Sequence, residues 1–313
     1  MNGDTYKDVK ATLPPSFVAG KIGIVTVTYN SESMLDDFLA SVDRQSYRNF
    51  VLIAVDNASR DRTLTMLRER RSDGLILIDN STNLGVAAAN NQGIRAAIDA
   101  GCEYVLLLNN DVILDGELIA RLVAGISETR CSMAVPTIYF HTPAKSIWAA
   151  GGAFRVMLGF SVYHRYAYRE DSLETCQTKR IDYAPTCCVL IRREVFAEVG
   201  LMDERYFVYY DDVDFMFRAR KLHTAMFLIP DAKLWHKVNG LTGGAESDFS
   251  YYYGARGRAL FLYKHLGWVS ASLWTILHAG FDLSRAVLRK SFRHACKVKW
   301  RGMSDGKKVA LAA

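Results

Sequence analysis

The sequence lacks the cysteine patterns of a zinc site and of a disulfide framework. Its six cysteines are scattered, with no CxxC pair and no His/Cys spacing suited to tetrahedral zinc. They are Cys102, Cys131, Cys176, Cys187, Cys188 and Cys296. We therefore expect reduced thiols in a cytosolic setting.

Long apolar runs are also missing. Residues 1–20 mix charged side chains with two prolines and have no apolar stretch of the signal-peptide kind, so we interpret them as a loose lead-in. No window reaches the roughly 18 uncharged apolar residues of a membrane-spanning helix, although residues 266–283 come close. Neither GxGxxG nor GxxxxGKS/T follows any expected strand, which excludes a dinucleotide cradle and a P-loop.

The chain does contain the apolar material of a large core. Of its 313 residues, 50% are hydrophobic and 23% are charged, which is typical of a globular protein. The net charge of +6 is concentrated near the C-terminus, where residues 285–308 include nine Lys or Arg and one Asp. The rest of the chain is close to neutral, so the basic tail predicts an anionic partner surface.

Short apolar runs alternate with helical patterns in the first half. We expect strands at 22–29, 50–55, 75–78 and 104–108, and helices at 34–42, 63–70, 86–100 and 117–127. Continuous apolar runs are typical of strands that are buried on both faces. The pattern therefore predicts an α/β fold with a mostly parallel central sheet covered by helices.

Polar side chains follow all four expected strands. The clusters are Thr28 to Ser31, Asp56 to Asp61, Asp79 with Asn80, and Asn109 to Asp111. Ligands bind beyond the carboxyl ends of the strands in such sheets, so four clusters at one edge favour a binding site. Each cluster alone is also typical of turns and helix caps. The last cluster supplies the hard oxygen ligands that a phosphate-bridging cation prefers.

Five motifs occur in order between residues 21 and 264. They are Val27-Thr28-Tyr29-Asn30, Val55-Asp56-Asn57-Ala58-Ser59, Asn83-Leu84-Gly85 with Asn90-Asn91 and Gly93, Leu108-Asn109-Asn110-Asp111, and Tyr210-Asp211-Asp212-Val213-Asp214. In this order they resemble the family 2 glycosyltransferases, inverting enzymes of the GT-A fold, and especially their bacterial rhamnosyltransferase-like members.

The resemblance implies a site for a nucleoside-diphosphate sugar. The residues that it assigns to this site are Thr28, Tyr29, Asn30, Asp56, Asn83, Gly85, Asn90, Asn109, Asn110, Asp111 and Arg256. Thr28 and Asp56 would lie at the nucleobase, whose N3–H a carboxylate can accept. For Thr28, an ordinary β-branched strand end is the alternative, and for Gly85 a plain helix start. For Arg256 the alternative is a solvated charge.

The resemblance also implies Mg2+ or Mn2+. Residues 109–111 stand where the family has its DxD signature, and this chain departs from it by Asn109 at the first position. Asp111, with His236, would hold a cation that neutralises the leaving diphosphate. A helix cap for Asp111 and an ordinary structural role for His236 are the alternatives. The glycines at 240, 243 and 244 would form a flexible lid.

On the acceptor side, Gly151 and Gly152 resemble a glycine pair near the family's acceptor pocket, although a turn explains them equally well. Asp211 replaces the glutamate of the family's Glu-Asp motif, and Asp212 matches its catalytic base. Like-charge repulsion from Asp211 and Asp214 would raise the pKa of Asp212. For Asp211 and Asp212 the alternative is capping of a helix at 213–222. For Asp214 an i,i+4 ion pair with Arg218 is favoured.

We divide the chain into the lead-in, a catalytic domain at 21–265 and an amphipathic basic helical tail at 266–313. The catalytic domain comprises a nucleotide-binding half at 21–115 and an acceptor half at 116–265. The tail's aromatic, apolar and basic residues predict binding of residues 266–308 to an anionic membrane. Packing on the catalytic domain or on a second subunit is the alternative. No nucleic-acid recognition fold accompanies the tail.

The expected reaction is transfer of a sugar to a hydroxyl with inversion and without an enzyme nucleophile. Family likeness alone suggests rhamnose from a dTDP donor, with UDP as the other nucleotide. The acceptor would be a glycan or a lipid-linked molecule in cell-surface polysaccharide synthesis, at the cytoplasmic face of the inner membrane. The rival is a non-catalytic scaffold of the same fold, to which Asn109 lends support. A nucleotidyltransferase is disfavoured because the chain has no glycine-rich, lysine-bearing first loop.

Overall fold

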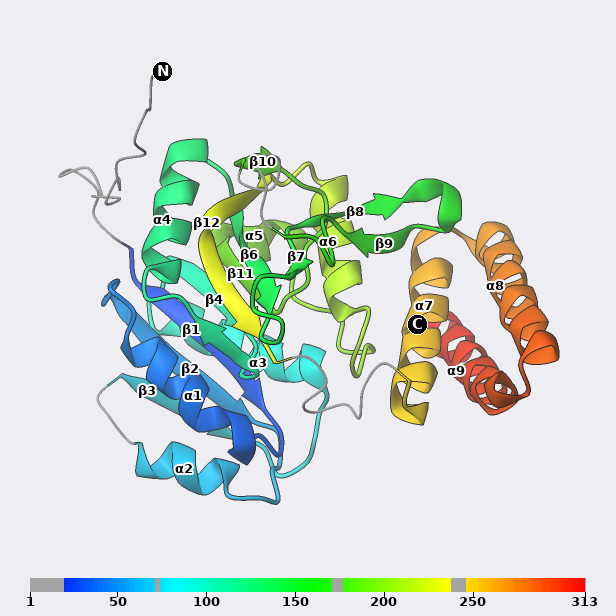
Figure 1. Cartoon of the computed structure of the whole chain (residues 1–313), viewed down its shortest axis with the longest axis horizontal. Coiled ribbons are helices and arrows are strands. Elements are labelled where there is room, and N and C mark those ends of the chain that lie inside the picture. The colour runs from blue at the N-terminus through cyan, green and yellow to red at the C-terminus, as the bar shows by residue number, and fades with distance from the viewer. Residues whose placement is uncertain (1–19, 71–73, 171–176, 238–245, 313) are drawn as a thin grey trace.

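The computed structural model describes residues 20–70, 74–170, 177–237 and 246–312 (Figure 1). The expected lead-in, except its last residue, and the expected glycine lid after His236 lie outside these residues. The described part contains a ten-stranded sheet in the order β10-β12-β6-β11-β4-β1-β2-β3, with β5 paired to β12 and β7 paired to β6. A separate hairpin is formed by β8 and β9.

The strands of the sheet are β1 (Ile22–Thr28), β2 (Phe50–Asp56), β3 (Leu75–Asp79), β4 (Tyr104–Leu108), β5 (Val112–Leu114), β6 (Met133–Phe140), β7 (Ile147–Ala149), β10 (Lys179–Arg180), β11 (Cys188–Arg192) and β12 (Met226–His236). The hairpin strands are β8 (Gly152–Arg155) and β9 (Ser161–His164). The helices are α1 (Glu32–Asp43), α2 (Thr63–Glu69), α3 (Val86–Asp99), α4 (Leu118–Thr129), α5 (Arg193–Val199), α6 (Asp211–Lys221), α7 (Asp248–His265), α8 (Trp268–Leu288) and α9 (Arg293–Leu311).

The sheet is buried on both faces, as the continuous apolar strands predict. Alternate residues of one strand enter two different cores: Val25 faces a cluster that includes residues of α3 and α6, and Ile24 faces a cluster that includes residues of α1 and α4. At Gly23 a Cβ atom would lie 2.4 Å from that of Ala97, so glycine is required for α3 to approach this closely. The predicted α/β fold is confirmed.

The strand order explains how the polar clusters meet. Strands β3, β2, β1 and β4 are parallel, and their register pairs Thr28 with Asp56 and Asp56 with Asp79. Strand β11 then runs antiparallel between β4 and β6, while β12 is parallel to β6. The carboxyl ends of β1, β2 and β3 therefore lie at one edge of the sheet.

The last strand of the sheet is longer than the sequence pattern indicates. The apolar run at 225–229 predicts a strand that ends before Trp235 and His236, and this boundary is wrong, because β12 continues to His236. Pro230 has no N–H for the ladder, and the register shifts between Ile229 and Lys233 to accommodate the interruption. His236 therefore ends a strand of the sheet.

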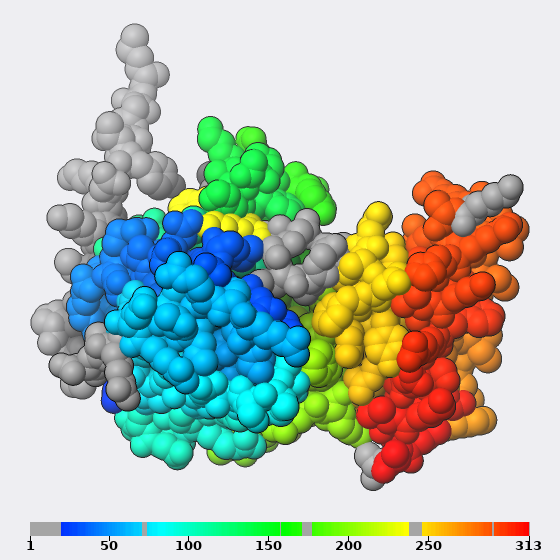
Figure 2. Space-filling view, turned by 90° about the horizontal axis from the view of Figure 1, so that it is seen from below, coloured from blue at the N-terminus to red at the C-terminus, as the bar shows by residue number. Residues whose placement is uncertain are grey.

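Helices α7, α8 and α9 form a lobe beside the sheet (Figures 1 and 2). Helix α9 packs tightly on α7, since a Cβ at Gly302 would lie 2.3 Å from the carbonyl oxygen of Tyr252 and one at Gly306 would lie 2.1 Å from that of Arg256. The turn of the β8–β9 hairpin reaches this lobe, where Gly159 contacts Trp274 of α8. No described helix is long and apolar enough to cross a membrane.

Candidate active site

The carboxyl ends of β1 and β2 are joined through Asp56. This fully buried carboxylate accepts a 2.9 Å hydrogen bond from the Thr28 hydroxyl and a 2.6 Å bond from the Ser59 hydroxyl, both at Oδ1. Its Oδ2 accepts the amide N–H of Ser59 at 2.9 Å. Asp56 thus organises the loop after β2, which is the turn-forming role that the residue type also suggests. Tyr29 and Asn30 are exposed beside it.

A second loop is built on Asn83 and Gly85. Asn57 donates to the side-chain oxygen of Asn83 and to the carbonyl oxygen of Gly85, both at 3.1 Å. Gly85 has a φ of +85° and contacts Phe207, whose carbonyl oxygen would lie 2.4 Å from a Cβ. Only glycine allows this contact. Asn90 is buried in α3 with its amide directed to the sulfur of Met202, so the structure places it against protein atoms.

The residues after β4 have different environments. Asn110 is buried, and its side-chain amide donates to the carbonyl oxygen of Val27 at 2.8 Å and to the Ser31 hydroxyl at 3.1 Å. Asn109 has an exposed side chain, and its backbone N–H donates to the carbonyl oxygen of Cys187. Asp111 precedes strand β5, so the helix-cap interpretation of this residue is wrong.

Asp111 and His236 lie together, although 125 positions separate them in the chain. Oδ2 of Asp111 is 3.1 Å from Nε2 of His236, and both side chains are nearly buried. Oδ1 of Asp111 and Nδ1 of His236 have no hydrogen-bond partner in the described structure. One free carboxylate oxygen beside an imidazole fits a divalent cation that takes its other ligands from phosphate and water. Within the described residues, no group of three or more His, Cys, Asp or Glu could hold a metal ion.

The second acidic cluster begins α6. Tyr210 occupies the N-cap position, so Asp211 and Asp212 lie in the first turn and neither is the capping residue that the alternative requires. Oδ2 of Asp212 accepts a 2.7 Å hydrogen bond from the Tyr183 phenol, and Oδ1 accepts the amide of Val213 at 2.7 Å. Asp211 is buried.

The electrostatics of this pair suit a base. Burial raises the pKa of Asp211, and the adjacent charge of Asp212 raises it further. Burial also raises the pKa of Asp212, while the hydrogen bond from Tyr183 opposes this effect. A carboxylate whose pKa lies above its ordinary range takes up a proton more readily, which is what general-base catalysis needs.

Asp214 has a separate, structural environment. It is fully buried, and its carboxylate lies 2.9 Å from Nε of Arg218, 2.7 Å from Nζ of Lys264 and 2.7 Å from Nε2 of His265. Burial raises its pKa, but the hydrogen bonds from His265 and Lys264 outweigh burial and the pKa is lowered. The expected pairing with Arg218 is present, and two residues of α7 extend it into a network that ties α7 to α6.

Two aromatic residues that we did not predict lie between these clusters. The Trp148 ring is 4.6 Å from that of His236 and 4.9 Å from that of His164, centroid to centroid. The His164 ring is in turn 5.9 Å from the ring of Tyr183. Burial lowers the pKa of His164 to about 4, so the imidazole is neutral at pH 7. Neither residue belongs to a motif, and no periodic pattern marks them.

The predicted acceptor-side glycines position the hairpin. A Cβ at Gly152 would lie 2.4 Å from the carbonyl oxygen of Tyr163 and 2.8 Å from the ring of Tyr183. Gly151 has a φ of +67°. These positions require glycine, and they let the hairpin approach the tyrosine that holds Asp212.

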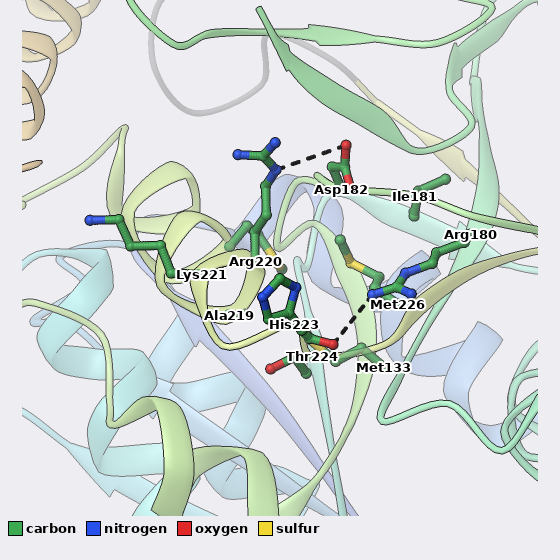
Figure 3. Close-up of a pocket in the computed structure, with 11 residues that line it drawn as sticks. Met133, Arg180, Ile181, Asp182, Ala219, Arg220, Lys221, His223, Thr224 and Met226 are labelled. Carbon is green, nitrogen blue, oxygen red and sulfur yellow. Dashed lines mark hydrogen bonds and ion pairs between the residues drawn. The ribbon is translucent and has the colours of Figure 1, made fainter. Parts of the chain in front are cut away.

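Two features lie apart from these contacts. Arg256 donates to the carbonyl oxygen of Arg205 at 2.9 Å, and its own backbone is covered by α9. A cavity of about 350 Å³ lies at the C-terminal end of α6 (Figure 3). Its basic side chains Arg180, Arg220 and Lys221 point in different directions and do not converge on a common point. None of the predicted site residues lines this cavity.

The sequence model of glycosyl transferase family 2 matches residues 23–200, which is more than half of the chain. The chain belongs to this family. It is 29% identical over 300 residues to the N-acetylglucosaminyl-diphospho-decaprenol L-rhamnosyltransferase of Mycobacterium tuberculosis, with 88% of this chain and 95% of that protein covered. It is 25% identical over 255 residues to a dTDP-rhamnosyl transferase of Shigella flexneri, with 77% of this chain and 79% of that protein covered.

Solved structures agree on the fold of this glycosyltransferase. GalNAc-T7, determined with UDP, GalNAc and Mn2+, has a TM-score of 0.63 at 16% identity, covering 90% of this chain and 56% of that one. A mannosyltransferase of Pyrobaculum calidifontis, determined with GDP-Man and Mn2+, has a TM-score of 0.56 at 15% identity, covering 98% of this chain and 90% of that one. The predicted GT-A fold and the rhamnosyltransferase-like resemblance are confirmed.

Proposed function

We propose that this glycosyltransferase transfers rhamnose from dTDP-rhamnose, with inversion, to a hydroxyl of a lipid-linked or free glycan acceptor in polysaccharide synthesis. The observation that carries the proposal is a continuous series of contacts. It runs from Asp111 and His236 through the rings of Trp148 and His164 to Tyr183 and Asp212. One end offers a cation site for a diphosphate, and the other offers a base. The names of the two rhamnosyltransferase relatives support the donor and the lipid-linked acceptor.

The reaction needs one displacement. The acceptor oxygen forms a bond to the anomeric carbon as the bond from that carbon to the diphosphate oxygen breaks. The electron pair of the broken bond leaves with the diphosphate, and Asp212 takes the proton of the acceptor hydroxyl. Tyr183 orients Asp212, and the carbon inverts because the acceptor attacks from the side opposite the leaving group.

A bound Mg2+ or Mn2+ would supply electrostatic stabilisation of the charge that develops on the leaving diphosphate. Asp111 and His236 would hold it, with phosphate oxygens and water as the other ligands. The unpartnered Oδ1 of Asp111 supports this role. Asn109 lacks the charge of the family's first aspartate, so Asp111 would be the principal anionic ligand from the protein.

We further propose that the enzyme docks on the cytoplasmic face of the inner membrane through α8. The residues of α8 that are 48–82% exposed are Trp268, Val269, Leu273, Ile276, Leu277, Phe281, Leu283, Val287 and Leu288. So large an apolar surface marks an interaction site. Basic residues at the end of α8 and in α9 fit anionic lipid headgroups. In a dimer that paired this surface with its copy, the positive charges of the two lobes would repel each other.

The hairpin supports a membrane-bound acceptor. Its turn contacts Trp274 of α8 through Gly159, and its base contacts Tyr183 through Gly152. A glycan presented by a lipid at α8 would therefore meet the protein on the side of the hairpin, close to Asp212.

Thermal shifts with dTDP, UDP and GDP, each with and without Mn2+, test the donor. A ligand that binds only the native state raises the melting temperature by mass action, so dTDP with Mn2+ should give the largest shift. A larger shift with UDP or GDP would refute the dTDP assignment. Hydrolysis of dTDP-rhamnose in the presence of Mn2+ separates the enzyme from the rival scaffold, which should release no dTDP.

A further inference from the structure

We propose that Trp148 and His164 bind the sugar that the enzyme transfers. The inference rests on the proposed function, because it takes Asp111 with His236 as the diphosphate end of the site and Asp212 as the base. It assigns a role to two residues that belong to none of the family motifs in the sequence.

The position of the two rings is the first argument. Trp148 comes from β7 and touches His236, the partner of Asp111. His164 comes from β9 and lies between Trp148 and Tyr183, the partner of Asp212. The two rings thus connect the diphosphate end of the site to the base.

The geometry of the reaction is the second argument. In an inverting displacement the leaving oxygen, the anomeric carbon and the attacking oxygen lie nearly in line. The sugar ring that carries the anomeric carbon must then lie between the diphosphate and the base. Side chains that connect these two ends, as Trp148 and His164 do, flank this ring.

The chemistry of the two side chains is the third argument. Both are only partly buried, so a ligand can reach them. An indole offers a flat apolar face for the C–H side of a sugar, and ligand sites combine such faces with a few polar groups. Nδ1 of His164 is a buried polar atom without a hydrogen-bond partner in the described structure. A sugar hydroxyl would supply the missing partner once the imidazole turns and exposes Nδ1 to the ligand.

The test separates sugar binding from nucleotide binding. Calorimetry in Mn2+ measures the Kd of dTDP and of dTDP-rhamnose for the wild-type chain, Trp148→Ala, His164→Ala and His164→Asn. We expect the dTDP affinity to stay within about twofold of wild type in all variants, which also reports that they fold. The dTDP-rhamnose affinity should fall about tenfold in Trp148→Ala and roughly threefold to tenfold in His164→Ala, the scale of one lost hydrogen bond.

Two comparisons sharpen this test. His164→Asn keeps a polar group near the position of Nδ1 and should retain more of the sugar-dependent affinity than His164→Ala. His223→Ala and Trp300→Ala change the same residue types on exposed surfaces elsewhere and should bind both ligands as wild type does.

The inference and the proposed function fail in different ways. Normal dTDP-rhamnose affinity in Trp148→Ala and His164→Ala would overturn the inference and leave the proposed function intact. Binding of UDP but not of dTDP to the wild-type chain would refute dTDP-rhamnose as the donor, and with it the binding of rhamnose by Trp148 and His164. Absence of any nucleotide binding would overturn the proposed function and the inference together.

Discussion

The phenol of Tyr183 donates a 2.7 Å hydrogen bond to Oδ2 of Asp212 and so joins the segment before β11 to the first turn of α6. Burial raises the pKa of Asp212, and this hydrogen bond lowers it and so opposes the effect of burial. The bond also fixes the direction of the carboxylate, because Oδ1 is held at the same time by the amide of Val213. Tyr183 is therefore a positioning residue for the proposed base.

Tyr183→Phe should lower turnover about tenfold, the scale of one hydrogen bond to a charged group. Loss of the bond raises the pKa of Asp212 further, so the acid limb of the turnover profile should move to higher pH. The deficit should be larger at pH 6 than at pH 8. A profile from pH 5 to 9 checks this, and an unchanged acid limb would exclude the role of Tyr183 in setting this pKa.

Asp212→Asn should leave the affinity for dTDP nearly intact and lower turnover about a hundredfold or more, the usual scale for loss of a general base. Turnover is measured at saturating acceptor, so that binding effects do not contribute. Near-normal turnover of the variant would remove Asp212 from its proposed role.

Asp111→Ala and Asp56→Ala should weaken nucleotide binding in different ways. Asp111→Ala should abolish the enhancement by Mn2+, because the free Oδ1 that would hold the ion is lost. Asp56→Ala should weaken binding with and without metal, because Asp56 organises the loop after β2. Calorimetry of both variants checks this, and wild-type Mn2+ enhancement in Asp111→Ala would contradict the metal assignment.

Asp214→Asn should destabilise the fold by about 3 kcal/mol or more, because it leaves the partly buried cations Arg218 and Lys264 without their buried anion. The folded-state pKa of Asp214 is lowered, so the unfolded chain binds its proton first as the pH falls. The stabilisation is therefore present above the ordinary carboxyl pKa of about 3.9 and is lost as the pH falls below it.

Urea unfolding at pH 7 and at low pH measures this difference between Asp214→Asn and wild type. The difference in the free energy of unfolding should be largest at pH 7 and should become smaller below pH 4. Asp231→Asn, at an exposed acid, is the control and should be close to neutral at both values. A difference that does not depend on pH would show that the network does not act through the charge of Asp214.

Ile276→Glu combined with Phe281→Glu should release the enzyme from anionic liposomes and spare dTDP binding. Both side chains are more than 60% exposed on α8, so the fold should tolerate the change. Leu222→Glu, at an exposed apolar residue of a different surface, is the control. Truncation after Gly267 is a poorer test because it also removes α9, which covers α7. No co-sedimentation of the wild type at low salt would refute membrane docking.

The first half of the fold could be read from the sequence because its strands are buried on both faces and leave continuous apolar runs. Strand β4 occupies the expected residues 104–108, and β1, β2 and β3 differ from their expected ranges by one residue at the C-terminal end. Parallel strands place their carboxyl ends at one edge, so the sequence pattern alone could place Thr28 and Asp56 together.

Local patterns could not determine the other contacts of the site. Tyr183 meets Asp212 across 29 positions and Asp111 meets His236 across 125 positions. The motif resemblance pointed to Asp111, Asp212 and His236, but not to the side chains that hold or connect them. Trp148 lies on a three-residue strand and His164 on a four-residue strand, which are too short to carry a periodic signal.

The sequence by itself determined the α/β class, the polar edge of the sheet and the basic, apolar character of the tail, because composition and periodicity report local burial. Only the tertiary structure decided that β12 continues to His236, that α9 is packed on α7 while the apolar face of α8 is exposed, and that the hairpin touches both Tyr183 and α8. These outcomes depend on contacts between distant segments, whose energies are set by shape and register and leave no local pattern in the chain.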